Sequence, residues 1–160
     1  MGQYIPDRAR LREILEEEKR KGKKVIFGNG CFDLLHVGHV RYLQGAKALG
    51  DILVVAVNDD SSLVTIGKRR APVTPLGERV EILCALACVD YVTSFSEPTV
   101  AELLLELKPH IQAKGTDYTP DTVPERHVVR SYGGEVAIVG DEKNHSTRDI
   151  IEQVRKMGDS

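Results

Sequence analysis

The stretch GNGCFDLLHVGHVRYLQ, residues 28–44, carries a Gly-x-Gly pair and two histidines that lie three positions apart. It follows the short apolar run KKVIFG, which predicts a buried strand, and it leads into a segment with the apolar spacing of a helix. A loop that only had to turn the chain would need neither the paired glycines nor both histidines. The stretch therefore predicts a ligand-binding loop between a strand and a helix.

The glycines predict a backbone that comes close to a ligand. Gly28 and Gly30 permit dihedral angles that a side chain would forbid. The amides of residues 29–32 could then face phosphate oxygens. A helix that begins near His39 would add unpaired N–H groups and the positive end of its dipole, which together favour an anion.

The two histidines predict charge stabilisation at the same place. His36 and His39 are close to one helical turn apart, so both rings could face the same oxygens, and Gly38 would leave space between them. As hydrogen-bond donors, the imidazoles could stabilise the charge that develops during phosphoryl transfer. The combined pattern, a strand followed by Gly-x-Gly, an aromatic residue and HxGH at a helix start, favours a functional site over a plain turn.

The rest of the chain alternates short apolar runs with helical patterns. This alternation predicts a parallel sheet covered by helices on both faces. Ligands bind such sheets at the carboxyl ends of the strands, so the loops 28–38, 58–74, 114–124 and 140–146 should meet at one edge. The segment 58–74 is polar and basic, which predicts a mobile loop. The predicted strands are 23–28, 51–57, 90–94, 110–113 and 135–139, and the predicted helices are 7–21, 39–49, 75–88, 100–107, 125–132 and 147–157.

Composition limits the kind of protein. The 160 residues, 41% of them hydrophobic and 29% charged, fit a single domain, with an N-terminal helix in 1–22 and an α/β core in 23–160. A formal net charge of −2 predicts no general attraction to nucleic acid or membranes. The longest strongly apolar run, 52–57, is too short to span a bilayer, and the charged N-terminus predicts no export signal, so we expect a cytoplasmic protein. Three cysteines without a CxxC pair argue against a disulfide framework, and Cys84 and Cys88 are expected to be small buried side chains that share one helical face.

The segment GNGCFDLLHVGHVRYL, followed by AKALGDILVVAVNDD, resembles the HxGH nucleotidyltransferase superfamily and its cytidylyltransferase-like branch. GKKV, AKGTDY, YGGEVAIV and HSTRDIIEQ resemble the heptose 1-phosphate adenylyltransferases within that branch. The resemblance implies a Rossmann-like, doubly wound sheet of five parallel strands. It also implies transfer of AMP from ATP to D-glycero-β-D-manno-heptose 1-phosphate, which gives ADP-heptose and pyrophosphate in lipopolysaccharide biosynthesis.

The resemblance also implies roles for individual residues. His36, His39 and Lys68 would be catalytic, and Asp33 would either hold its loop or contact the sugar phosphate. The implied nucleotide contacts are Gly30, Cys31, Phe32, Gly38, His39, Lys114, Gly115, Asp117, Tyr118, Ser146 and Thr147. The implied acceptor contacts are Asp33, Asn58, Asp60, Arg70 and Arg79. No protein-bound metal is implied; Mg²⁺ would be held by the nucleotide and water, and the protein would be a homodimer.

Some positions depart from the heptose pattern and leave alternatives open. Relatives usually carry TNG where this chain has Gly28 and the next two residues, and they usually carry STT where Arg148 follows Ser146 and Thr147. Which of the residues 68–70 reaches the phosphates is also open. An alternative is a cytidylyltransferase that uses CTP with glycerol 3-phosphate or a related alcohol phosphate. Another is a nucleotide-binding module without catalysis.

Overall fold

The computed structural model describes residues 1–65, 67, 71–142 and 145–158. Six strands form one parallel sheet in the order β1-β4-β3-β2-β5-β6. From the central strand β2 the chain adds β3 and β4 on one side, and then crosses to add β5 and β6 on the other. The strands are β1 (Gln3–Tyr4), β2 (Val25–Gly30), β3 (Ile52–Asn58), β4 (Tyr91–Phe95), β5 (Ile111–Lys114) and β6 (Glu135–Ile138).

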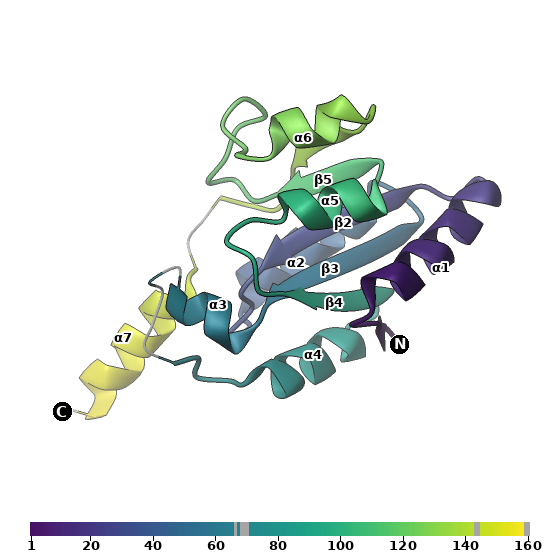
Figure 1. The fold of residues 1–160 in the computed structure, drawn as a ribbon. Helices are drawn as coiled ribbons and strands as arrows, with labels where there is room; N and C mark the ends of the chain where they lie inside the picture. The colour runs from purple at the N-terminus through teal and green to yellow at the C-terminus, as the bar shows by residue number, and fades with distance from the viewer. Residues whose placement is uncertain (66, 68–70, 143–144, 159–160) are drawn as a thin grey trace.

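Helices cover both faces of the sheet, as the alternating pattern predicts (Figure 1). Helices α1, α5 and α6 pack on one face, and α2 and α4 pack on the other. Helix α7 lies beyond the carboxyl edge and contributes no buried residue. The helices are α1 (Arg8–Arg20), α2 (Val37–Lys47), α3 (Asp60–Thr65), α4 (Leu76–Ala85), α5 (Ala101–Leu107), α6 (Arg126–Ser131) and α7 (Thr147–Gly158).

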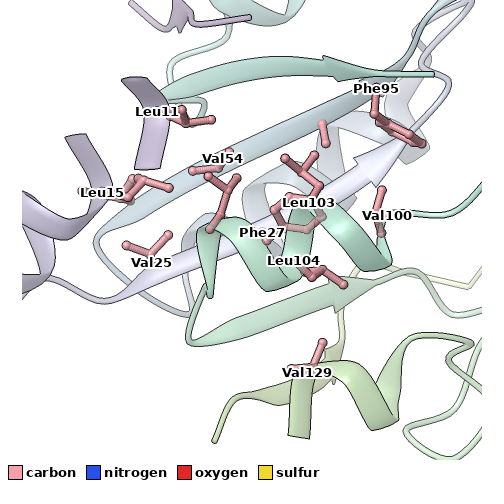
Figure 2. Packing of buried hydrophobic residues seen from close by; sticks show 13 residues of the cluster. Leu11, Leu15, Val25, Phe27, Val54, Phe95, Val100, Leu103, Leu104 and Val129 are labelled. Carbon is pink, nitrogen blue, oxygen red and sulfur yellow. The ribbon is translucent and has the colours of Figure 1, made fainter. Parts of the chain in front are cut away.

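Successive side chains of the central strands point to opposite faces of the sheet, so each strand contributes to two cores. On β2, Val25 and Phe27 pack with α1 and α5, whereas Ile26 packs with α2 and α4. Figure 2 shows the first core, in which Leu15 and Leu103 approach the sheet from two different helices. All residues of β3 are buried because this strand lies between β4 and β2 and is covered on both faces.

The structure corrects the predicted elements in four places. A short sixth strand, β1, pairs with β4; two residues are too few to produce a recognisable pattern. The segment 1–22 belongs to the core, because Leu11 and Leu15 are buried in it. Part of the segment 58–74, expected to be a mobile loop, forms α3. Helix α4 ends at Ala85, so the expectation that Cys84 and Cys88 share a helical face is wrong.

Burial raises the pKa of the thiols of Cys84 and Cys88, which keeps both in the unreactive protonated form. Among the described residues, no helix is long and apolar enough to cross a membrane.

Leu103 and Leu105 lie on the same helix and provide a matched test of the core. Leu103 is 0% exposed, whereas Leu105 is 49% exposed. We expect Leu103→Ala to lower the free energy of unfolding by about 2–5 kcal/mol, because it removes buried surface and leaves a cavity. Leu105→Ala should lower it by less than about 1 kcal/mol, since less surface leaves water there. Urea unfolding of both variants measures the difference, and equal losses would contradict the packing described.

Candidate active site

A cavity of about 930 Å³ opens at the carboxyl edge of the sheet. Residues of the loops that follow β2, β3, β5 and β6 line it, so the predicted convergence of these loops is confirmed. The loops after β2 and β5 lie at the point where the strand order switches, which is where ligands bind such sheets. The predicted site residues that line the cavity are Gly30, Cys31, Phe32, Asp33, His36, Gly38, His39, Asn58, Lys114, Gly115, Asp117, Tyr118, Ser146 and Thr147.

The two histidines of HVGH cap helix α2 and stack on each other. The Nδ1 atom of His36 accepts a hydrogen bond from the backbone N–H of Gly38 at 3.1 Å. In return, Nδ1 of His39 accepts from the backbone N–H of His36 at 3.3 Å. The two ring centroids are 3.9 Å apart. The helix therefore begins two residues earlier than predicted, at Val37, because His36 takes the capping role.

These two hydrogen bonds determine what the imidazoles present to the cavity. A neutral imidazole that accepts through Nδ1 carries its proton on Nε2. Each of the two rings is thereby a donor at its outer nitrogen, beside the positive end of the α2 dipole. Donors, a helix N-terminus and a cavity together suit a phosphate group.

Gly28 and Gly30 leave space for neighbouring side chains, and their dihedral angles are ordinary. Neither Gly28 nor Gly30 has a positive φ, so the expectation that they adopt dihedrals forbidden to other residues is wrong. A Cβ on Gly28 would lie 2.8 Å from the Tyr42 hydroxyl oxygen, and one on Gly30 would lie 3.1 Å from the Phe32 ring. The left-handed conformation falls on Phe32, with φ 51°, a strain that side-chain packing around the loop must offset.

Gly38 likewise makes room for a ring and not for a phosphate. A Cβ at this position would lie 2.9 Å from Cε1 of His36. The ring occupies that space in order to reach the Gly38 N–H, so the expected gap between the two histidines is filled by the imidazole itself. Any side chain here would push the His36 ring out of its capping position.

The opposite wall of the cavity comes from the end of β5. The ammonium of Lys114 lies 4.7 Å from the centroid of the Tyr118 ring, a cation–π distance. Gly115 and Asp117 lie between them on the cavity lining. Beneath this wall, Tyr42 donates to the Ala113 carbonyl at 2.6 Å, and burial raises the pKa of its hydroxyl, which therefore stays protonated.

The start of α7 closes the cavity from outside the sheet. The Ser146 hydroxyl accepts from the Asp149 N–H at 3.0 Å and caps the helix. The Thr147 hydroxyl donates to the Leu34 carbonyl at 3.0 Å, which attaches this helix to the segment 31–36 between β2 and α2, here called the histidine loop. A second helix N-terminus thus faces the same cavity as that of α2.

The sequence profile of cytidylyltransferase-like proteins matches residues 27–160, which include the carboxyl end of every strand that borders the cavity. The chain belongs to this family. Its α/β fold with a parallel sheet agrees with the predicted nucleotidyltransferase type.

Curated relatives share about half of their aligned residues with the chain. The bifunctional protein HldE of Pelobacter propionicus is 50% identical over 150 residues, and that of Syntrophotalea carbinolica is 50% identical over 147 residues. These matches cover 94% and 92% of this chain, but only 31% and 30% of the two relatives. The chain therefore spans about a third of the length of the curated relatives that it matches.

Two solved structures resemble the fold. The lipopolysaccharide core biosynthesis protein from Thermoplasma volcanium is 29% identical, with a TM-score of 0.66, and the match covers 76% of this chain and 100% of that one. A pantoate-beta-alanine ligase from Francisella tularensis, crystallised with β,γ-ATP and beta-alanine, has a TM-score of 0.65 at 17% identity and covers 100% of this chain and 79% of that one. The second likeness concerns the fold alone.

Within this cytidylyltransferase-like site, Arg79 does not act where the resemblance implies. Its side chain is buried, at 1% exposure, and does not line the cavity. The guanidinium donates to the carbonyls of Cys31 and Asn58 at 2.7 Å each and to the Thr74 carbonyl at 2.9 Å. It also pairs with Asp60 at 2.7 Å, and neither Arg79 nor Asp60 lines the cavity, although the Asp60 side chain is 46% exposed.

Asp33 lines the cavity but also holds a loop. Its carboxylate accepts the backbone N–H of Val73 at 3.0 Å and that of Thr74 at 2.8 Å. Of the two roles implied for this residue, the contacts support that of holding a loop. The remaining predicted cations, Lys68, Arg69 and Arg70, lie outside the described residues.

Several cavity residues were not predicted from the sequence. His145 lies with its ring centroid 6.2 Å from that of His36, which adds a third imidazole to the phosphate side. Arg148 and Arg155 line the cavity from α7, although Arg148 had been noted only as a departure from the STT pattern. The side chain of Asn29, between the two glycines, lines it as well. Asn29 could have been predicted as a site residue, because it directly follows the predicted strand 23–28. The positions of the α7 residues relative to the cavity could be found only from the tertiary structure.

Replacement of Arg79 tests its structural role. We expect Arg79→Met to lower the free energy of unfolding by about 3 kcal/mol, since three buried carbonyls lose their donor. The surface cation Arg12, which pairs with Glu106, is the control, and Arg12→Met should cost less than about 1 kcal/mol. Denaturant unfolding measures both. An Arg79 variant that kept its stability would contradict this role.

The space at Gly28 can be tested against the threonine of the heptose pattern. We expect Gly28→Thr to cost about 1–3 kcal/mol of stability, because the new side chain meets the Tyr42 hydroxyl. Adding Tyr42→Phe removes that hydroxyl and should recover part of the loss, so a double-mutant cycle should give a coupling of at least about 0.5 kcal/mol. Additive effects in thermal and urea unfolding would show that the two residues do not compete for space.

Proposed function

We propose that the chain is a nucleotidyltransferase that transfers AMP from MgATP to D-glycero-β-D-manno-heptose 1-phosphate, with ADP-heptose and pyrophosphate as products. The observation that carries this proposal is the stacked, reciprocally capped pair His36 and His39 at the N-terminus of α2, inside the cavity at the switch point of the sheet. The identity of 50% to bifunctional HldE proteins over most of this chain supports the heptose branch.

The proposed reaction is an in-line displacement at the α-phosphorus of ATP. An oxygen of the sugar phosphate forms a bond to this phosphorus while the bond to the pyrophosphate oxygen breaks. The attacking phosphate is ionised at neutral pH, so no protein group has to remove a proton. The Nε2–H donors of His36 and His39 and the positive end of the α2 dipole would stabilise the charge that develops on the phosphate oxygens.

We propose that Mg²⁺ enters as part of the substrate MgATP. Mg²⁺ prefers oxygen ligands and commonly keeps water and substrate phosphates around it. Among the described residues, no three His, Cys, Asp or Glu side chains gather in a way that could hold a metal ion. The cavity lining includes the imidazoles of His36 and His39 and the cations Lys114, Arg148 and Arg155, which suit phosphate oxygens.

The remaining roles belong to the same proposal. Lys68 would supply a cation to the phosphates, and Asn58 would contact the acceptor. The nucleotide would contact Gly30, Cys31, Phe32, Gly38, His39, Lys114, Gly115, Asp117, Tyr118, Ser146 and Thr147, all of which line the cavity. We further propose that residues 1–160 form one domain, that the protein acts as a homodimer, and that it uses the ATP of the cytoplasm.

A second candidate keeps the reaction and changes the substrates. The match to the cytidylyltransferase-like profile favours a test of CTP with glycerol 3-phosphate. Pyrophosphate release should therefore be measured for ATP and CTP, each with heptose 1-phosphate and with glycerol 3-phosphate. We expect the ATP and heptose 1-phosphate pair to give the highest kcat/KM. Nucleotide binding without pyrophosphate release from any pair would favour a module that binds without catalysis.

Substitution of the histidine pair tests the proposed chemistry. We expect His36→Ala and His39→Ala each to lower kcat by about 10²–10³, the usual loss when one donor to a developing charge is removed. His127, an exposed histidine on α6, is the matched control, and His127→Ala should keep its activity. Circular dichroism establishes that each variant is folded. Full turnover by a folded His36→Ala enzyme would refute the role proposed for that residue.

A further inference from the structure

Three polar side chains lie beneath the cavity on the sheet face that α1, α5 and α6 cover. Gln112 on β5 is fully buried, Glu125 at the start of α6 is 8% exposed, and Asn29 at the end of β2 lines the cavity. The Nε2 atom of Gln112 donates to Oδ1 of Asn29 at 3.2 Å and lies 3.5 Å from Oε2 of Glu125. We call these three residues the amide floor.

The amide floor has only one favourable orientation. Both neighbours of Gln112 present acceptor oxygens, so its NH₂ group must face them, and a flipped amide would bring oxygen against oxygen. The consequence is that Oε1 of Gln112 has no hydrogen-bond partner among the residues that the structure describes, a costly arrangement for a buried polar atom. In return, the hydrogen bond from Gln112 holds the side-chain amide of Asn29 in one orientation.

Asn29 then offers its NH₂ group to the cavity. Its Oδ1 is directed at Gln112, so Nδ2 points the other way, and no described residue accepts a hydrogen bond from it. The neighbouring Asn58 differs, because its Nδ2 donates to the Ser62 hydroxyl at 3.0 Å. An oriented donor without a protein partner, on a cavity wall, suits a ligand oxygen.

The surroundings of Asn29 indicate which part of a ligand binds there. On the β3–β4 side of Asn29, the side chains that the sheet and the segment before α5 add to the cavity wall are uncharged, whereas the charged Lys114 lies on the β5 side. The uncharged side chains are Asn58, Phe95, Pro98 and Val100. Figure 2 shows Phe95 and Val100 at the same end of the core, away from Leu11 and Leu15. An apolar surface beside amide donors and acceptors suits the carbon face and hydroxyls of a sugar, whereas the imidazoles lie on the α2 side.

We propose that Asn29 is a specificity-determining residue that donates through Nδ2 to a sugar oxygen of the phosphorylated acceptor, and that Gln112 and Glu125 are positioning residues that orient it. This inference rests on the proposed function, in which the acceptor attacks the α-phosphorus from the side opposite pyrophosphate. The nucleotide would occupy the α2 and β5–β6 side of the cavity, and the sugar would occupy the β3–β4 side.

The test measures kcat and the two KM values separately, with MgATP and heptose 1-phosphate. We expect Asn29→Ala to raise the KM for the sugar phosphate about five-fold to ten-fold, the value of one hydrogen bond, and to change the KM for MgATP by less than about two-fold. Gln112→Met and Glu125→Leu leave Asn29 in place and should raise the same KM about three-fold. Glu125→Gln retains an acceptor oxygen and should restore the wild-type value.

Thr93→Val is the matched control for a change in a buried polar group. The Thr93 hydroxyl on β4 is buried on the same sheet face without a partner among the described residues, but Thr93 does not line the cavity and contacts no member of the amide floor by hydrogen bond, so this substitution should leave both KM values unchanged. If Asn29→Ala fails to fold, the comparison of Gln112→Met with Glu125→Leu and Glu125→Gln carries the test. An unchanged KM for the sugar phosphate, or an equal rise in both KM values, overturns the inference.

Failure of this inference is distinguishable from failure of the proposed function. If the wild-type enzyme releases pyrophosphate and the variants show no selective change, only the role of the amide floor is wrong. If the wild-type enzyme releases no pyrophosphate, the proposed function is wrong, and calorimetric binding of heptose 1-phosphate to wild type and Asn29→Ala then decides on the amide floor. Equal affinity of the two proteins, or binding by neither, overturns it.

Discussion

The guanidinium of Arg79 connects the carboxyl ends of the two central strands, and the geometry of the cavity depends on it. Its hydrogen bonds reach Cys31 after β2, Asn58 at the end of β3, Thr74 before α4 and Asp60 on α3. A buried cation with so many donors must be satisfied almost completely, so these four segments can take few other arrangements. Asp33 adds two further bonds to the segment around Thr74. The hydrogen bonds of Arg79 and Asp33 therefore fix the position of the segments that surround the histidine loop.

At the start of α2, the backbone and the histidine side chains hold each other in place. His36 and His39 accept hydrogen bonds from backbone N–H groups at the start of α2. The same hydrogen bonds that cap this helix therefore also orient both rings. The amide floor follows a similar logic on the other sheet face, where Glu125 orients Gln112 and Gln112 orients Asn29. In both cases a group that would contact ligand is held by hydrogen bonds to its neighbours, which is how enzymes keep catalytic geometry before substrate arrives.

Much of the fold and part of the site could be predicted from the sequence. Apolar runs identified the five longer strands, since a buried parallel strand is apolar on both faces. The position of loops after strands predicted that Lys114, Ser146 and His36 meet at one edge. The resemblance assigned Arg79 and Asp60 to the acceptor, but a likeness in sequence does not reveal whether a charged side chain turns inward to carbonyls or outward to a ligand. The glycines were given a conformational role, whereas their neighbours in space, Tyr42 and the ring of His36, give them a steric one.

By itself, the sequence determined the family of this protein and the order of its elements, because periodicity and the HxGH spacing are local properties of the chain. Only the tertiary structure decided which polar groups face the cavity. Gln112, Asn29 and Glu125 are separated by up to 96 positions in the chain, and their hydrogen bonds form because β2 and β5 are neighbours in the sheet. Burial and partners are properties of such long-range contacts. Because of these contacts, Arg79 has a structural role, and the amide of Asn29 is directed at the cavity.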